Sequence, residues 1–226
     1  MLIGKEAVKK LDSSRVAVFG LGGVGGYTVE ALARCGVGAL DLVDNDIVAL
    51  SNLNRQIIAV RDTIGMKKTE AARRRVKAIN PECCVILHDV FYLPETKDQF
   101  DFSEYDYVVD AIDTVTGKLQ LIEEAARSGT PIISSMGAGN KLEATLFRVA
   151  DIYDTSEDPL CRVIRGECRK RGIKKLKVVY STEKPRKPLF EEKGGTRRST
   201  PASISFVPSV CGLIIAGEVV KDLTSL

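Results

Sequence analysis

Continuous apolar runs alternate with segments of helical periodicity through the first 135 residues of the chain. Apolar runs without polar alternation are typical of parallel strands buried on both faces. They lie at residues 15–19, 40–43, 84–87, 107–111 and 131–135. The helical patterns between them lie at residues 23–35, 67–79 and 116–127. This order predicts an α/β fold with a doubly wound, mostly parallel, Rossmann-like sheet and helices on both faces.

The pattern changes beyond Gly139. Residues 143–149 and 177–181 predict two further strands, which we expect to extend the sheet in an antiparallel sense. A basic helical pattern at 159–171 separates them, and an apolar helix is expected at 208–223. The C-terminal part of the chain is therefore expected to add to the sheet rather than to repeat the strand–helix alternation.

The charge of the chain is uneven. The net charge is only +3, but residues 161–198 carry 14 Lys and Arg against 4 Asp and Glu. Residues 183–199, which overlap the end of this basic segment, are also rich in Pro and Gly and predict a mobile loop. A strongly basic segment on an otherwise acidic body indicates a polyanionic partner. A merely solvated basic surface is the alternative.

Composition excludes some classes of protein. The longest apolar stretch, residues 206–220, contains Pro208, Ser209 and Glu218 and is too short to cross a membrane. The six cysteines form no disulfide framework, so we expect a reduced, cytoplasmic protein. The only histidine, His88, is expected to be an ordinary strand-end residue, which argues against a serine–histidine triad.

A glycine-rich turn follows the first strand pattern. Gly20, Gly22, Gly23 and Gly25 precede a helix, where backbone N–H groups can approach a phosphate. Asp44 ends the second strand pattern 24 residues after Gly20, where a carboxylate accepts hydrogen bonds from ribose hydroxyls. The combination predicts a ligand that contains adenosine. Glycines that serve only packing, beside an unrelated acid, are the alternative.

Further polar residues favour ATP over NAD. The pyrophosphate of NAD carries two negative charges, whereas ATP carries about four and its cleavage requires cations and usually magnesium. Cations and a possible metal ligand, Asp113, are expected at the same sheet edge as the glycine turn. Taken singly, each could be a surface or turn residue. The candidates are Ser51, Asn52, Asn54, Arg55, Lys68, Asp113 and Thr114.

These motifs resemble those of the ThiF/MoeB superfamily, the ubiquitin-activating-like adenylating enzymes. The resemblance is carried by residues 18–25, 44–46, 51–56, 65–68 and 110–113. It implies a single ThiF-type adenylating domain over residues 1–226. Residues 1–150 would form its nucleotide-binding core, and residues 151–226 a basic extension with the final helix.

The resemblance also implies roles for individual residues. Gly23, Asp44, the run 51–55, Lys68 and Asp113 would contact ATP or its magnesium. Arg55 and Lys68 would neutralise the phosphates and Asp113 would ligate the metal, so these three would be the catalytic residues. The resemblance further implies a homodimer.

Within the superfamily, the chain is most similar to the tRNA threonylcarbamoyladenosine dehydratase branch. The supporting stretches include residues 54–56, 61–65, 79–82, 137–139 and 158–160. Members activate the threonyl carboxylate of a modified tRNA adenosine with ATP, and the side chain then closes into a ring with loss of water. The similarity implies that tRNA is the partner of the basic segment 161–198.

One departure from related branches concerns cysteine. The MoeB and ThiF branches commonly carry paired Cys-x-x-Cys zinc ligands. Here Cys161 and Cys168 are seven residues apart, and Cys83 and Cys84 are adjacent. Neither spacing suits a tetrahedral zinc site, so we predict none.

Two other functions stay open. The first is activation of the C-terminus of a ubiquitin-like sulfur-carrier protein, with a sulfur-transfer partner. The second is a nucleotide-binding module without chemistry, such as an NAD-dependent sensor, against which Arg55, Lys68 and Asp113 count. Apolar residues near the C-terminus are expected either to form a dimer interface or to cover the sheet. They are Ile204, Phe206, Val207, Val210, Leu213, Ile214 and Val219.

Overall fold

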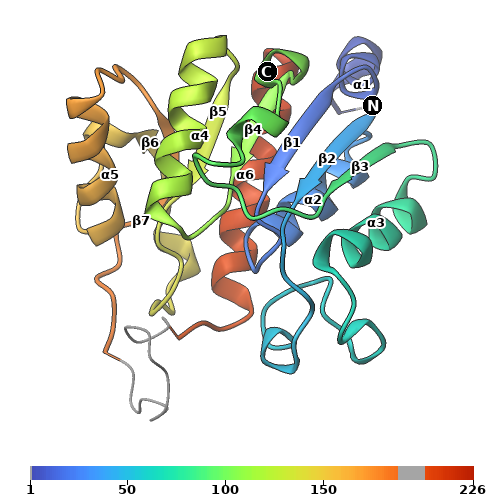
Figure 1. Ribbon diagram of the computed structural model, residues 1–226, viewed down its shortest axis with the longest axis horizontal. Coiled ribbons are helices and arrows are strands. Elements are labelled where there is room, and N and C mark those ends of the chain that lie inside the picture. The colour runs from blue at the N-terminus through green and yellow to red at the C-terminus, as the bar shows by residue number, and fades with distance from the viewer. Residues whose placement is uncertain (1, 188–201) are drawn as a thin grey trace.

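A seven-stranded sheet runs through the molecule, as the computed structural model shows for residues 2–187 and 202–226 (Figure 1). The strands are β1 Arg15–Phe19, β2 Ala39–Val43, β3 Cys84–His88, β4 Tyr107–Asp110, β5 Ile132–Ser135, β6 Phe147–Asp151 and β7 Lys177–Ser181. The helices are α1 Gly4–Asp12, α2 Gly25–Arg34, α3 Lys68–Ile79, α4 Val115–Ser128, α5 Pro159–Lys170 and α6 Phe206–Thr224. The predicted α/β fold class is confirmed.

The strand order is β3-β2-β1-β4-β5-β7-β6. From β1 the chain builds outward through β2 and β3, and then returns to the other side of β1 with β4. Such a reversal creates a crevice at the carboxyl ends of the two central strands, where α/β proteins bind their ligands. These ends, together with the loop of residues 44–66, lie at the bottom of Figure 1.

One detail of the C-terminal extension was predicted wrongly. Strand β7 pairs with β5 in parallel, and only β6 runs antiparallel, against β7. Moreover, β6 begins at Phe147 rather than at residue 143, because residues 144–146 form a turn of 3-10 helix. The chain thus passes β5, forms the edge strand β6 and then inserts β7 between them, an order that local apolar patterns do not encode.

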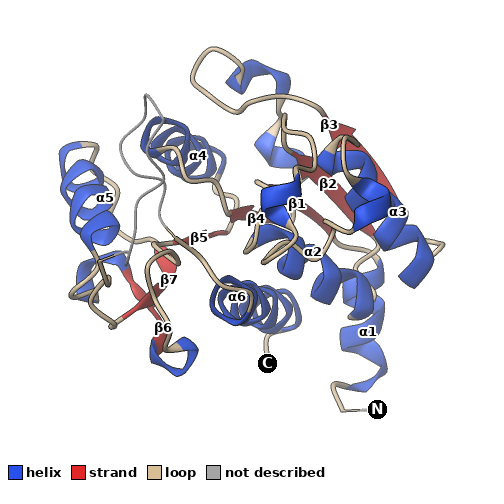
Figure 2. Cartoon of the chain, turned by 90° about the horizontal axis from the view of Figure 1, so that it is seen from below, coloured by secondary structure: helices blue, strands red, loops and turns tan. Residues whose placement is uncertain are grey.

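The sheet has a different cover on each face. Val16 and Val18 of β1 belong to a core shared with α1, α2, α3 and α6, whereas Ala17 and Phe19 face the opposite side. On that second side α4 and α5 pack, as the view along the sheet shows (Figure 2). The alternation follows directly from the two-residue period of a strand.

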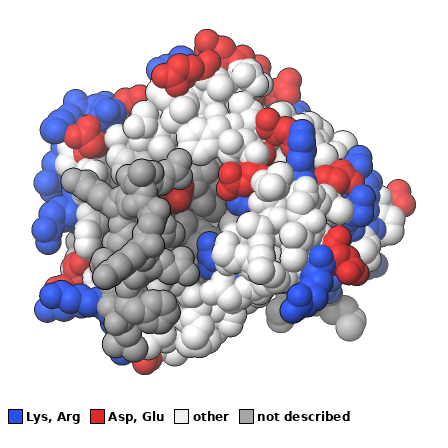
Figure 3. Space-filling model, turned by 60° about the horizontal axis from the view of Figure 1, so that its bottom comes forward, with Lys and Arg blue, Asp and Glu red and all other residues white. Residues whose placement is uncertain are grey.

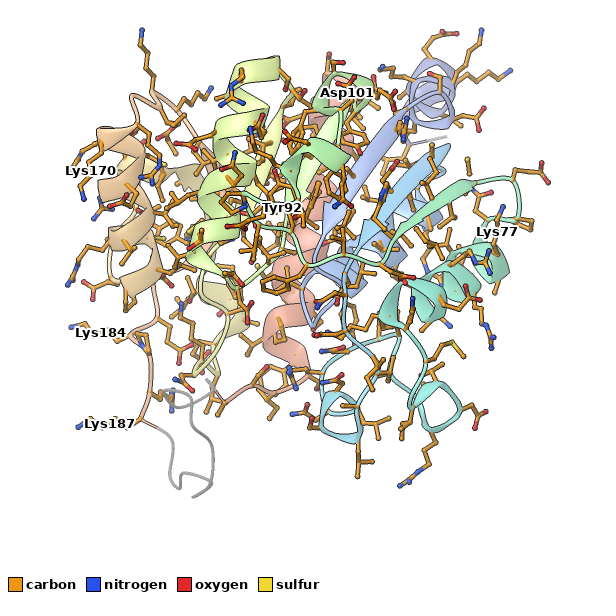
Figure 4. All side chains as sticks on the ribbon, viewed as in Figure 1. Lys77, Tyr92, Asp101, Lys170, Lys184 and Lys187 are labelled. Atoms are coloured by element: carbon orange, nitrogen blue, oxygen red, sulfur yellow. The ribbon has the colours of Figure 1, made fainter. Side chains whose placement is uncertain are left out.

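Next to α4, aromatic residues take the place of a helix. Between β3 and β4 the chain forms only short 3-10 turns. Their aromatic rings cover β1, with ring centroids 4.9 Å apart for Phe19 and Tyr92 and 5.2 Å apart for Phe19 and Phe100. Tyr92 lies between α4 and the sheet (Figure 4). This compact cover brings residues 90–92 to the carboxyl edge of the sheet.

Most of the other expected elements are confirmed within one or two residues. The helix α1 was not predicted, because most of its residues are polar or charged and only Leu11 among them is buried. Residues 188–199 of the expected mobile loop lie outside the described residues. In the described part of the chain, no helix is both long and apolar enough to cross a membrane.

His88 is part of a buried ion cluster. Its Nε2 lies 2.7 Å from Oδ1 of Asp41, and the guanidinium of Arg15 donates to both oxygens of that carboxylate. Burial acts to raise the pKa of Asp41, but the hydrogen bonds from His88 and Arg15 outweigh it and hold the pKa below its ordinary value. The histidine therefore has a structural role beside a carboxylate on β2.

We expect this cluster to make the protein sensitive to acid. A carboxyl group with a lowered pKa stabilises the fold above its unfolded-state pKa of about 3.9, and this stabilisation is lost as the pH falls through the lower, folded-state pKa. Asp41→Asn should lose about 1–3 kcal/mol of unfolding free energy at neutral pH and show a flatter decline below about pH 4. Urea unfolding between pH 3 and 7 measures this, with the exposed Asp12→Asn as control. An unchanged acid limb in Asp41→Asn would contradict the assignment.

Candidate active site

A cavity of about 270 Å³ opens at the carboxyl ends of β1, β2 and β4. It lies where the strand order reverses. Eight of the candidate residues line it, and these come from five separate segments of the chain. They are Gly20, Gly22, Asp44, Asn52, Arg55, Lys68, Asp113 and Thr114. The fold therefore brings the predicted nucleotide motifs together in one place.

The glycine turn forms the floor of the cavity. Gly20 has a φ of +90°, and a Cβ there would stand 2.7 Å from the carbonyl oxygen of Ala111. A Cβ on Gly25 would stand 1.8 Å from the carbonyl oxygen of Gly20, so this glycine serves close packing of α2 against β1 and does not line the cavity. The N–H groups of residues 22–25 donate to no acceptor in the described part of the chain. They form the unpaired N-terminus of α2, which favours an anion.

Gly23 lies beside the cavity without lining it. A Cβ on Gly23 would stand 3.1 Å from the Pro208 ring of α6 and 3.4 Å from Cγ of Arg55. The absence of a side chain thus lets the Arg55 stem pass between the glycine turn and α6.

Asp44 and Lys68 form an ion pair at the wall of the cavity. Oδ2 of Asp44 accepts from the N–H of Leu21 at 2.7 Å, and Oδ1 accepts from the N–H of Asp46 at 2.9 Å. Lys68, only 6% exposed, places Nζ 2.7 Å from Oδ2 of Asp46 and 3.7 Å from Oδ1 of Asp44. The ammonium group is therefore held at the cavity wall by the two carboxylates before any ligand binds.

The polar run divides into residues that line the cavity and residues that support it. Nη1 of Arg55 donates to the carbonyl oxygen of Ser51 at 2.9 Å and to Oδ1 of Asn54 at 3.1 Å. Asn54 itself donates to the carbonyl oxygen of Ser203. Ser51 and Asn54 do not line the cavity, whereas Asn52 and Arg55 do. The structure thus gives Ser51 and Asn54 a supporting position for the guanidinium.

Asp113 lies at the mouth of the cavity with an exposed carboxylate. Its one hydrogen bond to a described residue is a long contact of 3.5 Å with the Thr114 hydroxyl. As a hard oxygen ligand without a close protein donor, on the same cavity as Asp44 and Asp46, Asp113 suits magnesium. In the described part of the chain, no three His, Cys, Asp or Glu side chains lie close enough to hold a metal ion on their own, so the metal would share its ligands with a bound nucleotide.

A buried ion pair fixes the loop that carries Asp113. Nζ of Lys118 lies 2.8 Å from Oδ2 of Asp110 and 2.9 Å from the carbonyl oxygen of Ser135, and both charged side chains are fully buried. Burial raises the pKa of Asp110 despite the ammonium group. Lys118 thus joins α4 to the ends of β4 and β5 and fixes the end of β4 from which residues 111–114 continue. Sequence analysis missed this role, although a lysine on the apolar side of a helix was a visible signal.

The site contains other residues that sequence analysis did not single out. Val90, Phe91 and Ile112 give the cavity an apolar wall, and Gln56 lines it beside Arg55. The aromatic side chains after β3 carried no nucleotide motif, so no local signal pointed to them. Gln56 belonged to the polar run but was not assigned a role.

The cysteines lie outside the cavity lining. Burial raises the pKa of Cys83, Cys168 and Cys211 to about 11 and that of Cys161 to about 12. These four thiols stay protonated at neutral pH and are poor nucleophiles. Cys161 and Cys168 both pack into the core beneath α5.

Comparisons with known proteins agree with this geometry. The sequence matches the ThiF family over residues 1–226. It is 46% identical over 233 residues to the tRNA threonylcarbamoyladenosine dehydratase of Bacillus subtilis, covering 99% of this chain and 92% of that protein. It is 37% identical over 144 residues to the adenylyltransferase and sulfurtransferase UBA4 of Vanderwaltozyma polyspora, covering 64% of this chain and 33% of that protein.

A solved structure extends the similarity to the fold. The crystal structure of the Escherichia coli tRNA N6-threonylcarbamoyladenosine dehydratase TcdA in complex with ATP superposes with a TM-score of 0.90 at 33% sequence identity. The alignment covers 99% of this chain and 91% of that chain. The fold and the cavity define a nucleotide-binding α/β protein. The chain belongs to the ThiF family, as its motifs had indicated.

Proposed function

We propose that this protein uses ATP to adenylate the carboxylate of threonylcarbamoyladenosine in tRNA and then closes the activated side chain into a ring. The observation that carries the proposal is the assembly of Arg55, Lys68 and Asp113 around one cavity next to the glycine turn. The relatives named as dehydratases of this tRNA nucleoside, one of them solved with ATP, support both substrates.

The cavity offers each part of ATP a suitable environment. Asp44 ends β2, where ribose hydroxyls would donate to its carboxylate. The apolar wall of Val90, Phe91 and Ile112 would receive the adenine. The free N–H groups of the glycine turn, with Arg55 and Lys68, would hold the phosphates. Asp113 would hold magnesium, which when bound offsets negative charge on the departing pyrophosphate.

Adenylation by this site needs no general base. A carboxylate is an anion at neutral pH and can attack the α-phosphate directly, provided that the two anions are brought together. The single histidine, His88, lies in the ion cluster with Asp41, away from the cavity lining. The site would therefore accelerate the reaction by positioning the two anions and by neutralising their charge with Arg55 and Lys68. Ring closure at the activated carbonyl carbon then releases AMP.

The basic surface near α5 supports a tRNA substrate. Figure 3 shows Lys and Arg gathered along the edge of the molecule that carries α5. Lys170, Lys184 and Lys187 project outward from this edge (Figure 4). Some basic residues are engaged within the protein, because Lys170 and Arg171 pair with Glu167 and Arg165 donates to Thr155. Others, such as Arg162, Lys174 and Lys175, are exposed and have no acidic partner in the described part of the chain.

Replacement of Arg162, Lys174 and Lys175 together by Gln should weaken tRNA binding without changing ATP affinity. If each contacts one phosphate on a duplex region, the slope of log affinity against log salt should become shallower by about 0.9 per lost contact. Filter binding at several salt concentrations gives this slope. The matched control replaces three exposed cations elsewhere, Lys5, Lys9 and Arg61. Equal tRNA affinity in both triple variants would show that the surface is merely solvated.

We further propose that the protein is a homodimer. Apolar residues lie on two sides of α6. Val207 and Val219 are buried against the sheet, whereas Phe206 and Leu213 are 47% and 48% exposed. Ile204 is also exposed. The helix thus covers the sheet with one side and leaves apolar groups on the other, which is typical of an interface.

Sedimentation velocity should therefore show a dimer at micromolar concentration. Leu213→Asp should raise the dissociation constant of the dimer at least tenfold, because the substitution would bury an unpaired charge in the interface. Val163→Asp, at an exposed apolar position on α5, is the control. A wild-type monomer at all concentrations would rule out the dimer.

Activation of a ubiquitin-like carrier remains the second candidate, favoured by the similarity to UBA4. Nucleoside analysis of the tRNA distinguishes the two. After incubation with ATP and magnesium, tRNA that carries threonylcarbamoyladenosine should yield a nucleoside lighter by one water. Unchanged tRNA, together with AMP transfer to a carrier protein, would reverse the order of the two candidates.

A further inference from the structure

Asn140 joins three segments that are far apart in the sequence. Its backbone N–H donates to the carbonyl oxygen of Ala202 at 2.7 Å, and its Oδ1 accepts from the N–H of Ala202 at 2.7 Å. The carbonyl oxygen of Asn140 accepts from the N–H of Arg186 at 2.8 Å. One residue of the turn after β5 therefore fixes both the chain beyond β7 and the chain that leads into α6.

The backbone of Asn140 adopts an uncommon conformation to make these contacts. Its φ is +58°, in the left-handed region that residues other than glycine rarely adopt, although asparagine tolerates it better than most. A buried ion pair holds the same turn, because Nζ of Lys141 lies 2.7 Å from Oδ2 of Asp158 and 2.6 Å from the carbonyl oxygen of Gly137. Both charged side chains are only 1% exposed. Such conformations persist where the surrounding structure fixes them, and they cluster at functional sites.

The chain that Asn140 fixes reaches the candidate active site through Asn54. The carbonyl oxygen of Ser203, the residue after Ala202, accepts from Nδ2 of Asn54 at 2.9 Å. The two ends of a carboxamide differ, so an acceptor at Nδ2 leaves Oδ1 to face the other side. There, Oδ1 accepts from Nη1 of Arg55 at 3.1 Å. A carboxamide turned the other way would direct its donors at the guanidinium, which has no acceptor.

We propose that Asn140 is a positioning residue for Arg55, and that it acts through Asn54. This inference rests on the proposed adenylation, in which Arg55 neutralises charge on the α-phosphate. Oδ1 of Asn140 fixes the peptide N–H of Ala202, and with it the place of the Ser203 carbonyl oxygen. That oxygen in turn directs the Asn54 carboxamide towards Arg55. Because Arg55 acts mainly in the transition state, loss of its orientation should lower the saturated rate more than the ATP affinity.

Two substitutions separate the side chain of Asn140 from its backbone. Asn140→Gly keeps access to the positive φ but removes Oδ1, the acceptor for the Ala202 N–H. Asn140→Asp keeps an oxygen acceptor and tolerance of this φ, and Nδ2 of Asn140 donates to no described residue. Asn140→Gly should therefore slow adenylation about 3- to 10-fold at saturating ATP, as expected for one hydrogen bond, and Asn140→Asp should restore the rate.

The experiment is single-turnover formation of AMP at saturating ATP, magnesium and modified tRNA, with the unfolding midpoint measured on the same samples. Asn54→Ala and the double variant Asn54→Ala/Asn140→Gly are compared with Asn140→Gly. If Asn140 acts through Asn54, the double variant should be no slower than the slower single variant. Asn80→Gly, at an equally half-buried asparagine outside the cavity lining, should match the wild type.

A second measurement follows the Arg55 guanidinium directly. Nitrogen NMR reports how fast a guanidinium group rotates, and Arg55→Ala identifies the signal by its loss. Hydrogen bonds to Asn54 and to the Ser51 carbonyl oxygen slow this rotation in the wild type. Rotation should be faster in Asn140→Gly than in the wild type or in Asn140→Asp.

Four results would overturn the inference: a wild-type rate in Asn140→Gly, a lowered unfolding midpoint that accounts for its loss, losses that multiply in the double variant, or a rate in Asn140→Asp as low as in Asn140→Gly. Failure of the proposed function looks different. A wild-type protein that forms AMP only with a carrier protein would refute the tRNA substrate, and the ratios of variant to wild-type rate with the carrier would test Asn140. If the wild type forms AMP with neither, adenylation is refuted, and the rotation of Arg55 alone decides whether Asn140 orders it.

Discussion

Arg55→Ala is expected to slow adenylation by about 10²–10³-fold while ATP binding changes much less. Arg55 lines the cavity and its guanidinium is preset by the Ser51 carbonyl oxygen and Asn54. A preorganised donor acts mainly on charge that develops as the α-phosphate passes through its five-coordinate state, and loss of one such donor costs about this factor. The measurement is single-turnover formation of AMP from labelled ATP with saturating tRNA.

Two comparisons make the Arg55 result specific. Arg74→Ala removes an exposed arginine on α3 that pairs with Glu70, and it should leave the rate unchanged. Asp44→Ala should act chiefly on ATP affinity, because contacts with ribose hydroxyls hardly change along the reaction. If Arg55→Ala changes only the apparent ATP affinity and keeps the saturated rate, the catalytic role of Arg55 is wrong.

Asp113→Asn is expected to cause a loss of similar size that high magnesium partly restores. The exposed carboxylate has no close protein donor, and its loop is fixed by the buried Lys118–Asp110 pair, so the substitution should leave the fold intact. An amide oxygen is a weaker magnesium ligand than a carboxylate. The rate of AMP formation is titrated with magnesium, and calorimetry compares ATP affinity with and without the metal.

An exposed acid elsewhere on the molecule provides the control for Asp113. Asp154→Asn removes an exposed carboxylate from the short 3-10 turn after β6, outside the cavity lining, and should behave as the wild type at every magnesium concentration. A loss in Asp113→Asn that does not respond to magnesium would mean that Asp113 acts otherwise than as a metal ligand.

The sequence was informative where structure and function are encoded locally. Each continuous apolar run of the first 135 residues forms a strand of the parallel sheet. In β1, β2 and β4 the absence of polar alternation follows from burial on both faces, whereas the edge strand β3 is only partly buried. Gly20 and Asp44 were recognisable because a glycine turn and a strand-end acid have fixed places in such a sheet. Their convergence on one cavity follows from the parallel direction of β1 and β2.

Features that depend on distant parts of the chain could not be predicted. The parallel insertion of β7 between β5 and β6 depends on which strands meet, not on their composition. The burial of Lys118 depends on Asp110 and Ser135 from two other elements. Gly25 and Gln56 show the same limit, because only the fold reveals that Gly25 packs against Gly20 and that Oε1 of Gln56 has no hydrogen-bond partner among the described residues.

The central claim is that the cavity activates a carboxylate of modified tRNA with ATP, and exchange between ATP and labelled pyrophosphate tests it most directly. The protein is supplied separately with tRNA that carries threonylcarbamoyladenosine, with tRNA that lacks it, and with a ubiquitin-like carrier that ends in Gly-Gly. Exchange that depends on the modified tRNA, and that Arg55→Ala abolishes, is the result we predict. Exchange with the carrier alone, or with none of the three, would contradict the account.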